Sequence, residues 1–295
     1  MMICPDCHKE LEENSLGCQA CEWKGKIQDG IPIYLSSLDS NDEMFKRYLS
    51  NYEEISEDDL EESIQDHDYL RVQNEKLFSY IPPVNDLNVC EIGVGKGLLL
   101  QHLLKEKPKK LVGVDISIPY LKTIKHMSEN IELVVANAEN IPYENEFDVI
   151  IAADIIEHVF NVGDFLYCVN RALKPGGCFI VKTPNNEDIN IYSRIRGCKY
   201  NFVHLRNFSK KTLKTVLMGA GFQVDKIIYD GFYAYRKRSY IKNRPFLNTR
   251  YDNYFSKKYV NVHEVNKINN HIGRLLMNPI EITMLSRKPL ESSTA

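Results

Sequence analysis

The chain has 295 residues, of which 43% are hydrophobic and 26% charged, and its formal net charge is −3. This length fits one large domain or two modest ones, and the composition is that of a folded globular protein. The near-neutral charge excludes a protein that binds nucleic acid with its whole surface, but not one with a local basic patch. No apolar run approaches the roughly 18 residues of a membrane span, and the N-terminus lacks a basic segment followed by an apolar one, so we expect a cytoplasmic protein.

The first residues of the chain carry two pairs of cysteines. Cys4 and Cys7 are separated by two residues, as are Cys18 and Cys21, and ten residues lie between the pairs. Two such pairs at short separation have the spacing of a tetrahedral zinc site, and four thiolate ligands make such a site structural rather than catalytic. The alternatives are two disulfides or four free thiols, and the lack of a secretory signal disfavours disulfides. We predict a zinc-binding module over residues 1–36.

An acidic connector follows over residues 37–80. Twelve acids stand between residues 39 and 68 against two basic residues, a pattern typical of a solvated face or a linker. Apolar residues nevertheless recur there at helical spacing, namely Phe45, Tyr48, Leu49, Tyr52 and Ile55. The segment is therefore predicted to be a partly helical linker that can act as a lid, with a further helix over 69–80 that ends at Pro82 and Pro83.

From residue 81 onward, short apolar segments alternate with amphipathic ones. Five strands are predicted at 88–92, 110–114, 131–136, 147–152 and 178–183. Three helices are predicted between them at 98–104, 119–127 and 163–173. This alternation implies an α/β fold with a doubly wound, mostly parallel sheet that binds its ligand at the carboxyl ends of the strands.

A glycine-rich loop follows the first of these strands. Gly93, Gly95 and Gly97 stand two residues apart, whereas the dinucleotide fingerprint would need its third glycine at position 98, which is Leu98. No Gly-Lys-Ser/Thr follows, so a Walker loop is also excluded. The loop instead lets the backbone approach a ligand that is not a pyrophosphate. Asp115, at the end of the next strand, can accept both hydrogen bonds from a ribose diol.

Five segments carry a resemblance to a known family. They are Val89 to Gly97, Val112 to Ser117, Asn137 to Pro142, Phe147 to Ile150 with Ile156 to Val159, and Leu173 to Gly177. In order and spacing they resemble the class I S-adenosylmethionine-dependent methyltransferases, over about residues 70–287. The resemblance implies a Rossmann-like sheet of seven strands. It also implies a helix at 210–218 and two antiparallel strands at 222–229 and 281–287. We therefore assign residues 81–295 to a methyltransferase domain.

The N-terminal module has a resemblance of its own. Its run Asp29-Gly30-Ile31-Pro32 before an apolar strand is similar to the end of the zinc ribbons that occur as methyltransferase activator subunits or fused in front of methyltransferases.

The resemblance implies S-adenosylmethionine as the cofactor and gives roles to individual residues. Glu91 would help hold the amino group, Asp115 would bind the ribose, and Asn137 would lie beside the adenine. Asn137 stands where the family often has Asp, and its side-chain oxygen can still accept from the adenine amino group. Each acid taken alone would also suit a solvated strand end or a helix cap. The implied cofactor-binding residues are Glu91, Gly93, Gly95, Gly97, Asp115, Ile116, Asn137, Ala138, Glu139, Asp154 and Ile155.

Methyl transfer depends mostly on aligning the acceptor with the methyl group, and a hydroxyl acceptor also benefits from a general base. Histidine is the usual base near neutral pH. The candidates are His158, just after the fourth strand, and His204. Related small-molecule O-methyltransferases often carry a histidine in each place, and either residue could instead be structural. Tyr192 is a weaker candidate for the pocket lining.

The C-terminal third of the chain contains the residues that could bind the methyl acceptor. Residues 232–278 form an insertion between the last two strands, and residues 194–260 carry sixteen Lys or Arg and three Asp, interleaved with aromatic residues. Such a stretch can bind RNA, an anionic small molecule, or the acidic connector. We expect O-methylation of a small molecule or glycan precursor, such as a quinone, a polyketide or a sugar. The alternatives are an rRNA or tRNA methyltransferase and a non-catalytic cofactor-binding subunit.

Overall fold

The computed structural model describes residues 1–12, 15–63, 67–192, 195, 198–237, 244–246, 249 and 277–290. Most of the predicted 232–278 insertion, with most of its basic and aromatic residues, lies outside these ranges. Among the helices described, none is both long and apolar enough to cross a membrane.

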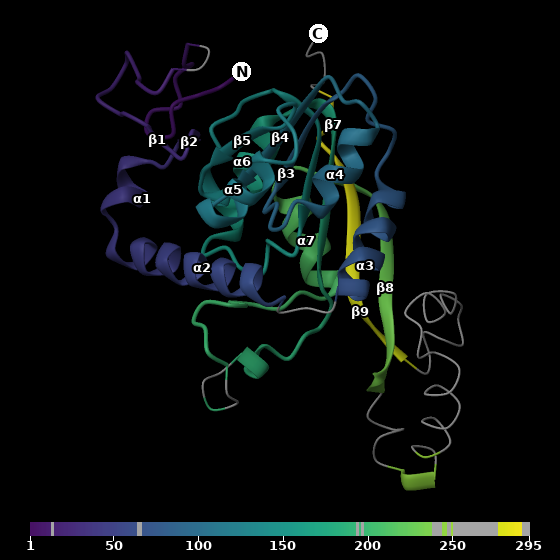
Figure 1. Cartoon of the computed structure of the whole chain (residues 1–295). Helices are drawn as coiled ribbons and strands as arrows, with labels where there is room; N and C mark the ends of the chain where they lie inside the picture. Colours follow the sequence, from purple (N-terminus) through teal and green to yellow (C-terminus); the bar gives the residue numbers. More distant parts are fainter. Residues whose placement is uncertain are drawn as a thin grey trace.

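A single nine-stranded sheet organises this part of the chain (Figure 1). Its strands are β1 (Lys26–Gln28), β2 (Ile31–Ile33), β3 (Asn88–Ile92), β4 (Lys110–Asp115), β5 (Glu132–Val135), β6 (Phe147–Ala153), β7 (Leu173–Pro184), β8 (Gln223–Lys237) and β9 (Met277–Arg287). They lie in the order β1-β2-β5-β4-β3-β6-β7-β9-β8. The run from β2 to β7 is parallel, and the pairs β1–β2, β7–β9 and β9–β8 are antiparallel. The predicted α/β, mostly parallel sheet is confirmed.

The predicted number of seven strands is wrong. Strands β3 to β9 supply the expected seven, and the hairpin β1–β2 of the N-terminal module adds two more. Ile33 of β2 pairs in parallel with Val135 of β5, and the Tyr34 amide donates to the Val135 carbonyl at 2.8 Å. An edge strand presents unpaired amides and carbonyls, and the module satisfies part of the β5 edge. The module therefore continues the sheet.

Helices cover both faces of the sheet. They are α1 (Ser37–Asn41), α2 (Glu43–Glu61), α3 (His67–Tyr80), α4 (Leu98–Lys105), α5 (Ile118–Lys125), α6 (Val162–Ala172) and α7 (Lys210–Gly219), with the 3-10 turns η1 (Ala138–Asn140) and η2 (Ile189–Tyr192). Alternate strand residues face opposite sides. Val89 packs in one apolar cluster with Leu99 of α4 and Leu121 of α5, and Cys90 packs in the other with Phe165 of α6.

Local signals explain where the predicted helices begin. The side chains of Ser117, Asn161 and Ser209 accept hydrogen bonds from the first turns of α5, α6 and α7, as expected of N-caps. The predicted turn at residues 174–177 lies instead inside β7, because Leu173 already pairs with Phe147. The register then shifts, and the turn residues form an irregularity within the strand.

The acidic connector is mostly helical. It contains α1, α2 and α3, and α2 buries Phe45, Tyr48, Asn51 and Ser56. In Figure 1, α2 lies below α5 and β3, away from the two chain termini. The connector therefore packs on the sheet domain instead of hanging free in solvent.

Candidate active site

A cavity of about 1340 Å³ opens at the carboxyl ends of β3, β4, β6 and β7. Its walls include Ile92 and Asp115 from the strand ends and Tyr52 from α2. Residues of α3, among them Gln73, also line it. This is the edge of the sheet at which the sequence predicts the ligand.

The glycine loop forms one wall and requires glycine at specific positions. Gly93, Gly95 and Gly97 have φ angles of 76°, 48° and 72°, in the left-handed region that side chains disfavour. A Cβ atom on Gly93 would lie 1.9 Å from Ile155 Cδ1, so the loop packs directly on Ile155. A Cβ on Gly95 would have no heavy atom within 4 Å. The loop therefore offers bare backbone to the cavity at Gly95.

Two carboxylates flank this loop. Glu91 is 4% exposed, and its Oε2 atom has no hydrogen-bond partner among the described residues. Burial, together with the charge of Asp115, raises the pKa of Glu91 well above its usual value. Asp115 accepts from the amides of Gly95 (3.1 Å) and Ser117 (2.8 Å). Burial raises the pKa of Asp115, and these backbone donors oppose the rise. Both predicted residues thus border the cavity with acceptor capacity remaining.

The segment Asn137 to Glu139 forms the next wall. The Asn137 side-chain oxygen accepts from the Glu139 amide at 3.0 Å, and its amide nitrogen donates to Asp39 of α1 at 2.9 Å. The Glu139 carboxylate accepts from the amides of Phe160 and Asn161 at the start of α6. The polar side chains predicted beside adenine therefore also hold this wall in place. Ile116 and Ala138 line the same cavity.

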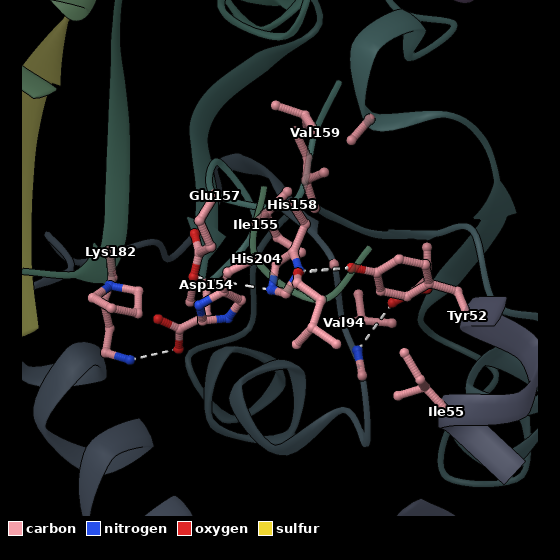
Figure 2. Close-up of a pocket in the computed structure, with 18 of the residues that line it drawn as sticks. Tyr52, Ile55, Val94, Asp154, Ile155, Glu157, His158, Val159, Lys182 and His204 are labelled. Atoms are coloured by element: carbon pink, nitrogen blue, oxygen red, sulfur yellow. Dashed lines mark hydrogen bonds and ion pairs between the residues drawn. The ribbon is translucent and has the colours of Figure 1, made fainter. Parts of the chain in front are cut away.

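An ionic cluster next to the end of β6 joins the partly exposed Asp154 to the buried Lys182 of β7 and Glu281 of β9 (Figure 2). Lys182 donates to Asp154 at 2.6 Å and lies 3.2 Å from Glu281. Burial alone would lower the pKa of Lys182, but these two carboxylates raise it above its ordinary value. Asp154 has φ 56°, an unusual value for a residue other than glycine. Its Oδ1 atom is buried without a partner among the described residues. A held, strained carboxylate at the cavity wall is typical of functional sites.

His158 faces the connector. Its Nδ1 atom lies 2.6 Å from the Tyr52 hydroxyl of α2, as Figure 2 shows. Burial, and secondarily the proximity of His204, lowers the pKa of His158 to about 3. The neighbouring Glu157 is buried, which raises its pKa well above the usual range, with a further rise from Asp154. Thr183 donates to Glu157 at 2.9 Å.

His204 lies beside His158, with ring centroids 4.6 Å apart. Its Nδ1 atom is hydrogen-bonded to Glu187, and the Tyr192 hydroxyl donates to the same carboxylate at 2.9 Å. The two histidine candidates are thus adjacent, and each has a different partner.

Sequence reasoning missed three of these partners: Tyr52, Lys182 and Glu187. Tyr52 belonged to an apolar helical stripe whose members resemble core residues. Glu187 and Lys182 stand near the end of β7, the position on a parallel strand at which site residues gather. Their place near the end of a parallel strand is the sequence signal by which these two residues could have been predicted as site residues.

Among the residues that the structure describes, two groups of side chains have the geometry to hold a metal ion. In the first, the four Sγ atoms of Cys4, Cys7, Cys18 and Cys21 lie within 4.8 Å of one another. The Cys4–Cys21 and Cys7–Cys18 separations are 3.6 and 3.5 Å, far longer than the ~2.05 Å of a disulfide. They are close to the ~3.8 Å edge of a tetrahedron with metal–sulfur bonds of ~2.3 Å. The second group is Glu157, His158 and His204.

Part of the chain matches a known protein family. The family described as "Methyltransferase domain" matches residues 41–227. The chain belongs to this family. The predicted methyltransferase is confirmed at this level, and the matched residues include the glycine loop and both histidines.

Curated relatives cover part of the chain. The ubiquinone biosynthesis O-methyltransferase of Dictyostelium discoideum is 31% identical over 46% of this chain and 47% of its own length. The enzyme of the same name from Rattus norvegicus is 26% identical over 52% of this chain and 50% of its own. A tRNA U34 carboxymethyltransferase from Pseudoalteromonas translucida is 30% identical over 37% of this chain and 35% of its own. The chain therefore spans about half of the length of the curated O-methyltransferases it matches.

Solved structures share the fold. A chain from a complex of the Haloferax volcanii Trm112 methyltransferase activator with a putative methyltransferase is 14% identical, with a TM-score of 0.52 over 77% of this chain and 100% of its own. A possible histamine N-methyltransferase from Thermotoga maritima is 17% identical, with a TM-score of 0.51 over 85% of this chain and 97% of its own. At these identities the likeness shows the fold alone.

Proposed function

We propose that the chain is an S-adenosylmethionine-dependent methyltransferase that methylates a hydroxyl oxygen of a small molecule. One observation carries the proposal: a single cavity holds both a cofactor side and an acceptor side. The cofactor side has the glycine loop, Glu91 and Asp115, and the acceptor side has His204 paired with Glu187. The ubiquinone O-methyltransferases among the relatives support an oxygen acceptor.

The chemistry of the cofactor side suits S-adenosylmethionine. The unpartnered, buried Oε2 atom of Glu91 is an acceptor for an ammonium group, and Asp115 can accept from ribose hydroxyls. The backbone at Gly95 leaves open space that a side chain would fill. When bound, the cofactor supplies an electrophilic methyl group, and this chain has only to align the acceptor and receive its proton.

His204 fits the role of general base better than His158. Glu187 engages Nδ1 of His204, which directs the other ring nitrogen, Nε2, to the proton of the acceptor hydroxyl. The carboxylate then stabilises the imidazolium that forms. His158, by contrast, has a pKa of about 3, and a base this weak transfers protons poorly near neutral pH. We assign His158 to holding Tyr52 of α2 over the cavity.

The charges of the lining favour an uncharged acceptor. Among the described residues that line the cavity, nine are Asp or Glu and three are Lys. Even without Glu91 and Glu157, whose pKa values burial raises well above the usual range, the remaining seven acids outnumber the three lysines. Such a surface repels phosphates, which disfavours RNA and phosphorylated sugars. A quinol, a polyketide phenol or a neutral sugar fits better. The tRNA-modifying relative keeps RNA methylation as the second candidate.

We also propose that the four N-terminal cysteines hold a structural zinc ion in the module of residues 1–36. The sulfur separations match a tetrahedral site, and a closed four-thiolate site leaves no position for a substrate. Residues 37–80 then form the lid, and residues 81–295 the methyltransferase domain.

Isothermal titration with S-adenosylmethionine tests the cofactor site, with Asp115→Ala as the matched variant. Transfer of a tritiated methyl group to a panel of catechols, neutral sugars and tRNA tests the acceptor. We expect binding that Asp115→Ala weakens at least tenfold and transfer to a hydroxyl that His204→Gln abolishes. Absence of cofactor binding to the unaltered chain would refute the enzyme and support the non-catalytic subunit. Transfer to tRNA alone would establish the second candidate.

A further inference from the structure

We infer that Asp39 of α1 is a positioning residue for the adenine wall of the cavity, and that the cysteine module fixes its position through Asp6. The inference rests on the proposed function, because it takes the wall at Asn137 to be part of the S-adenosylmethionine site. It gives the N-terminal module a role in cofactor binding.

The contact between Asp39 and Asn137 joins two distant parts of the chain. The Asn137 amide nitrogen donates to Asp39 Oδ1 at 2.9 Å, while Asp39 Oδ2 accepts from the Ser36 hydroxyl at 2.6 Å. Each carboxylate oxygen therefore has its own donor. The opposite end of the Asn137 amide accepts from the Glu139 amide at 3.0 Å. Asn137 is held at both ends, and this fixes the wall segment that follows it.

This contact explains why the chain has Asn where related methyltransferases often have Asp. A carboxylate at position 137 would keep the bond from Glu139 but would place an oxygen against Asp39 Oδ1, where the Asn137 nitrogen now lies at 2.9 Å. Two carboxylates at this distance cannot both stay ionised. The amide supplies a donor to one side and an acceptor to the other, so Asn is required as long as Asp39 is present.

The first cysteine pair with the two residues between them (residues 4–7, the first knuckle) contacts both α1 and the wall segment that starts at Asn137. Asp6 stands between Cys4 and Cys7, and its two oxygens accept from the backbone amide and hydroxyl of Ser37 at 2.7 and 2.6 Å. Ser37 is the first residue of α1, two positions before Asp39. The carbonyl of Pro5 in the same knuckle accepts from Asn140 at 2.8 Å, at the end of η1. The knuckle is therefore hydrogen-bonded to the wall segment directly, through Asn140, and is connected to it a second time through Ser37 and Asp39 of α1.

A metal ion bound by the four cysteines would fix the position of the knuckle and so of the contacts made by Pro5 and Asp6. Pro5 and Asp6 lie between two of the four thiols, so a metal that binds Cys4 and Cys7 fixes the backbone from which both contacts start. Without the metal the knuckle loses that constraint. The wall should then be less well ordered before cofactor binds, and ordering it would reduce the observed affinity.

A swap of the two side chains tests the contact. In calorimetry with S-adenosylmethionine, Asn137→Asp should raise the dissociation constant more than tenfold, because it creates the carboxylate pair. Asp39→Asn alone should change it less, because an amide oxygen still accepts from Asn137. The double variant Asp39→Asn/Asn137→Asp restores a donor–acceptor pair and should recover binding to within about threefold. Asp42→Asn is the control, since Asp42 only caps α2 and Asn caps equally well.

The module is tested by Asp6→Ala and by removing zinc with a chelator and adding it back. Each should weaken cofactor binding about tenfold while circular dichroism shows a folded sheet, and zinc should restore binding. If the unaltered chain binds cofactor and Asn137→Asp binds equally well, the inference is wrong while the proposed function stands. Failure of the double variant to recover would also overturn it. If the unaltered chain does not bind, the proposed function itself fails.

Discussion

Alanine substitutions at Gly93 and Gly95 should separate the stability of the glycine loop from its contact with ligand. Both residues have positive φ angles, 76° and 48°, but their surroundings differ. A Cβ on Gly93 would lie 1.9 Å from Cδ1 and 2.4 Å from Cγ1 of Ile155, whereas a Cβ on Gly95 would meet nothing within 4 Å. Gly93 therefore faces protein, and Gly95 faces the cavity.

The magnitudes follow from these distances. A left-handed backbone costs an alanine about 1–2 kcal/mol, and this applies to both variants. Overpacking adds about 1–3 kcal/mol where a side chain must move, and this applies to Gly93→Ala alone. We expect Gly95→Ala to lower the free energy of unfolding by about 1–2 kcal/mol and Gly93→Ala by about 2–5 kcal/mol. Gly95→Ala should instead weaken S-adenosylmethionine binding at least tenfold, or about 1.4 kcal/mol.

Urea titration and calorimetry measure the two quantities separately. Gly219→Ala is the control, because Gly219 ends α7 with no atom within 4 Å of its added Cβ and no positive φ. Ile155→Ala removes the two overlapping atoms and leaves Ile155 Cβ at 3.8 Å. Added to Gly93→Ala, it should therefore recover the overpacking part of the loss. Equal stabilities of Gly93→Ala and Gly95→Ala, or no recovery in the double variant, would refute this account of the loop.

Three further outcomes are expected. Lys182→Met removes the cation beside Asp154 and the buried Glu281, and should lower the free energy of unfolding in urea by about 3–5 kcal/mol; an unchanged value would contradict the ionic cluster. The pKa of His158 is about 3 in the folded chain against an ordinary 6.5, so the unfolded chain binds more protons between these values and stability is lost as the pH falls below 6.5. Between pH 6.5 and 5 this loss is about 1.6 kcal/mol, and it should be absent from His158→Gln. Chelation should lower the melting temperature of the unaltered chain but not that of Cys4→Ser, and equal shifts would argue against a metal at that site.

The strands and the glycine loop could be predicted because their signals are local. Burial on both faces gives a parallel strand a continuous apolar run, and β6 (Phe147–Ala153) shows one from Val149 to Ala153. The shorter β3 (Asn88–Ile92) leads directly into Gly93. The caps of α5, α6 and α7 are likewise local, because in each a single side chain accepts from the first turn of the helix. Asn137 lies on the cavity wall, and its place beside adenine stays a prediction.

The joining of the module to the sheet could not be predicted from these signals. The pairing of Ile33 with Val135 depends on which strand lies at the sheet edge, and sequence periodicity carries no record of it. The same holds for the partners of the site residues. Glu187 and His204 are seventeen residues apart, and Tyr52 and His158 are 106 apart. Only the folded chain brings them into contact.

The acidic residues and the uncharged residues of the connector make different kinds of contact with the rest of the chain. Asp58 pairs with Lys199 and accepts from the Tyr200 hydroxyl, and Asp59 lies 3.1 Å from Lys96 of the glycine loop. Of these contacts, only those of Lys199 and Tyr200 involve the basic stretch 194–260 that was predicted as a possible partner of the connector. The Asp58–Lys199 pair is largely exposed and stabilises weakly, whereas the Asp59–Lys96 pair is mostly buried.

Stronger contacts of α2 come from its uncharged residues. The Asn51 side chain donates to the Asn201 carbonyl at 2.6 Å and accepts from the Asn201 amide at 2.9 Å. Tyr52 reaches His158 at 2.6 Å, and Tyr48 packs on Phe160 with ring centroids 4.9 Å apart. Hydrogen bonds between buried groups are expensive to leave unmade. The uncharged side chains Tyr48, Asn51 and Tyr52 therefore help to fix where α2 lies. The contact of Tyr52 with His158 places α2 at the wall of the cavity.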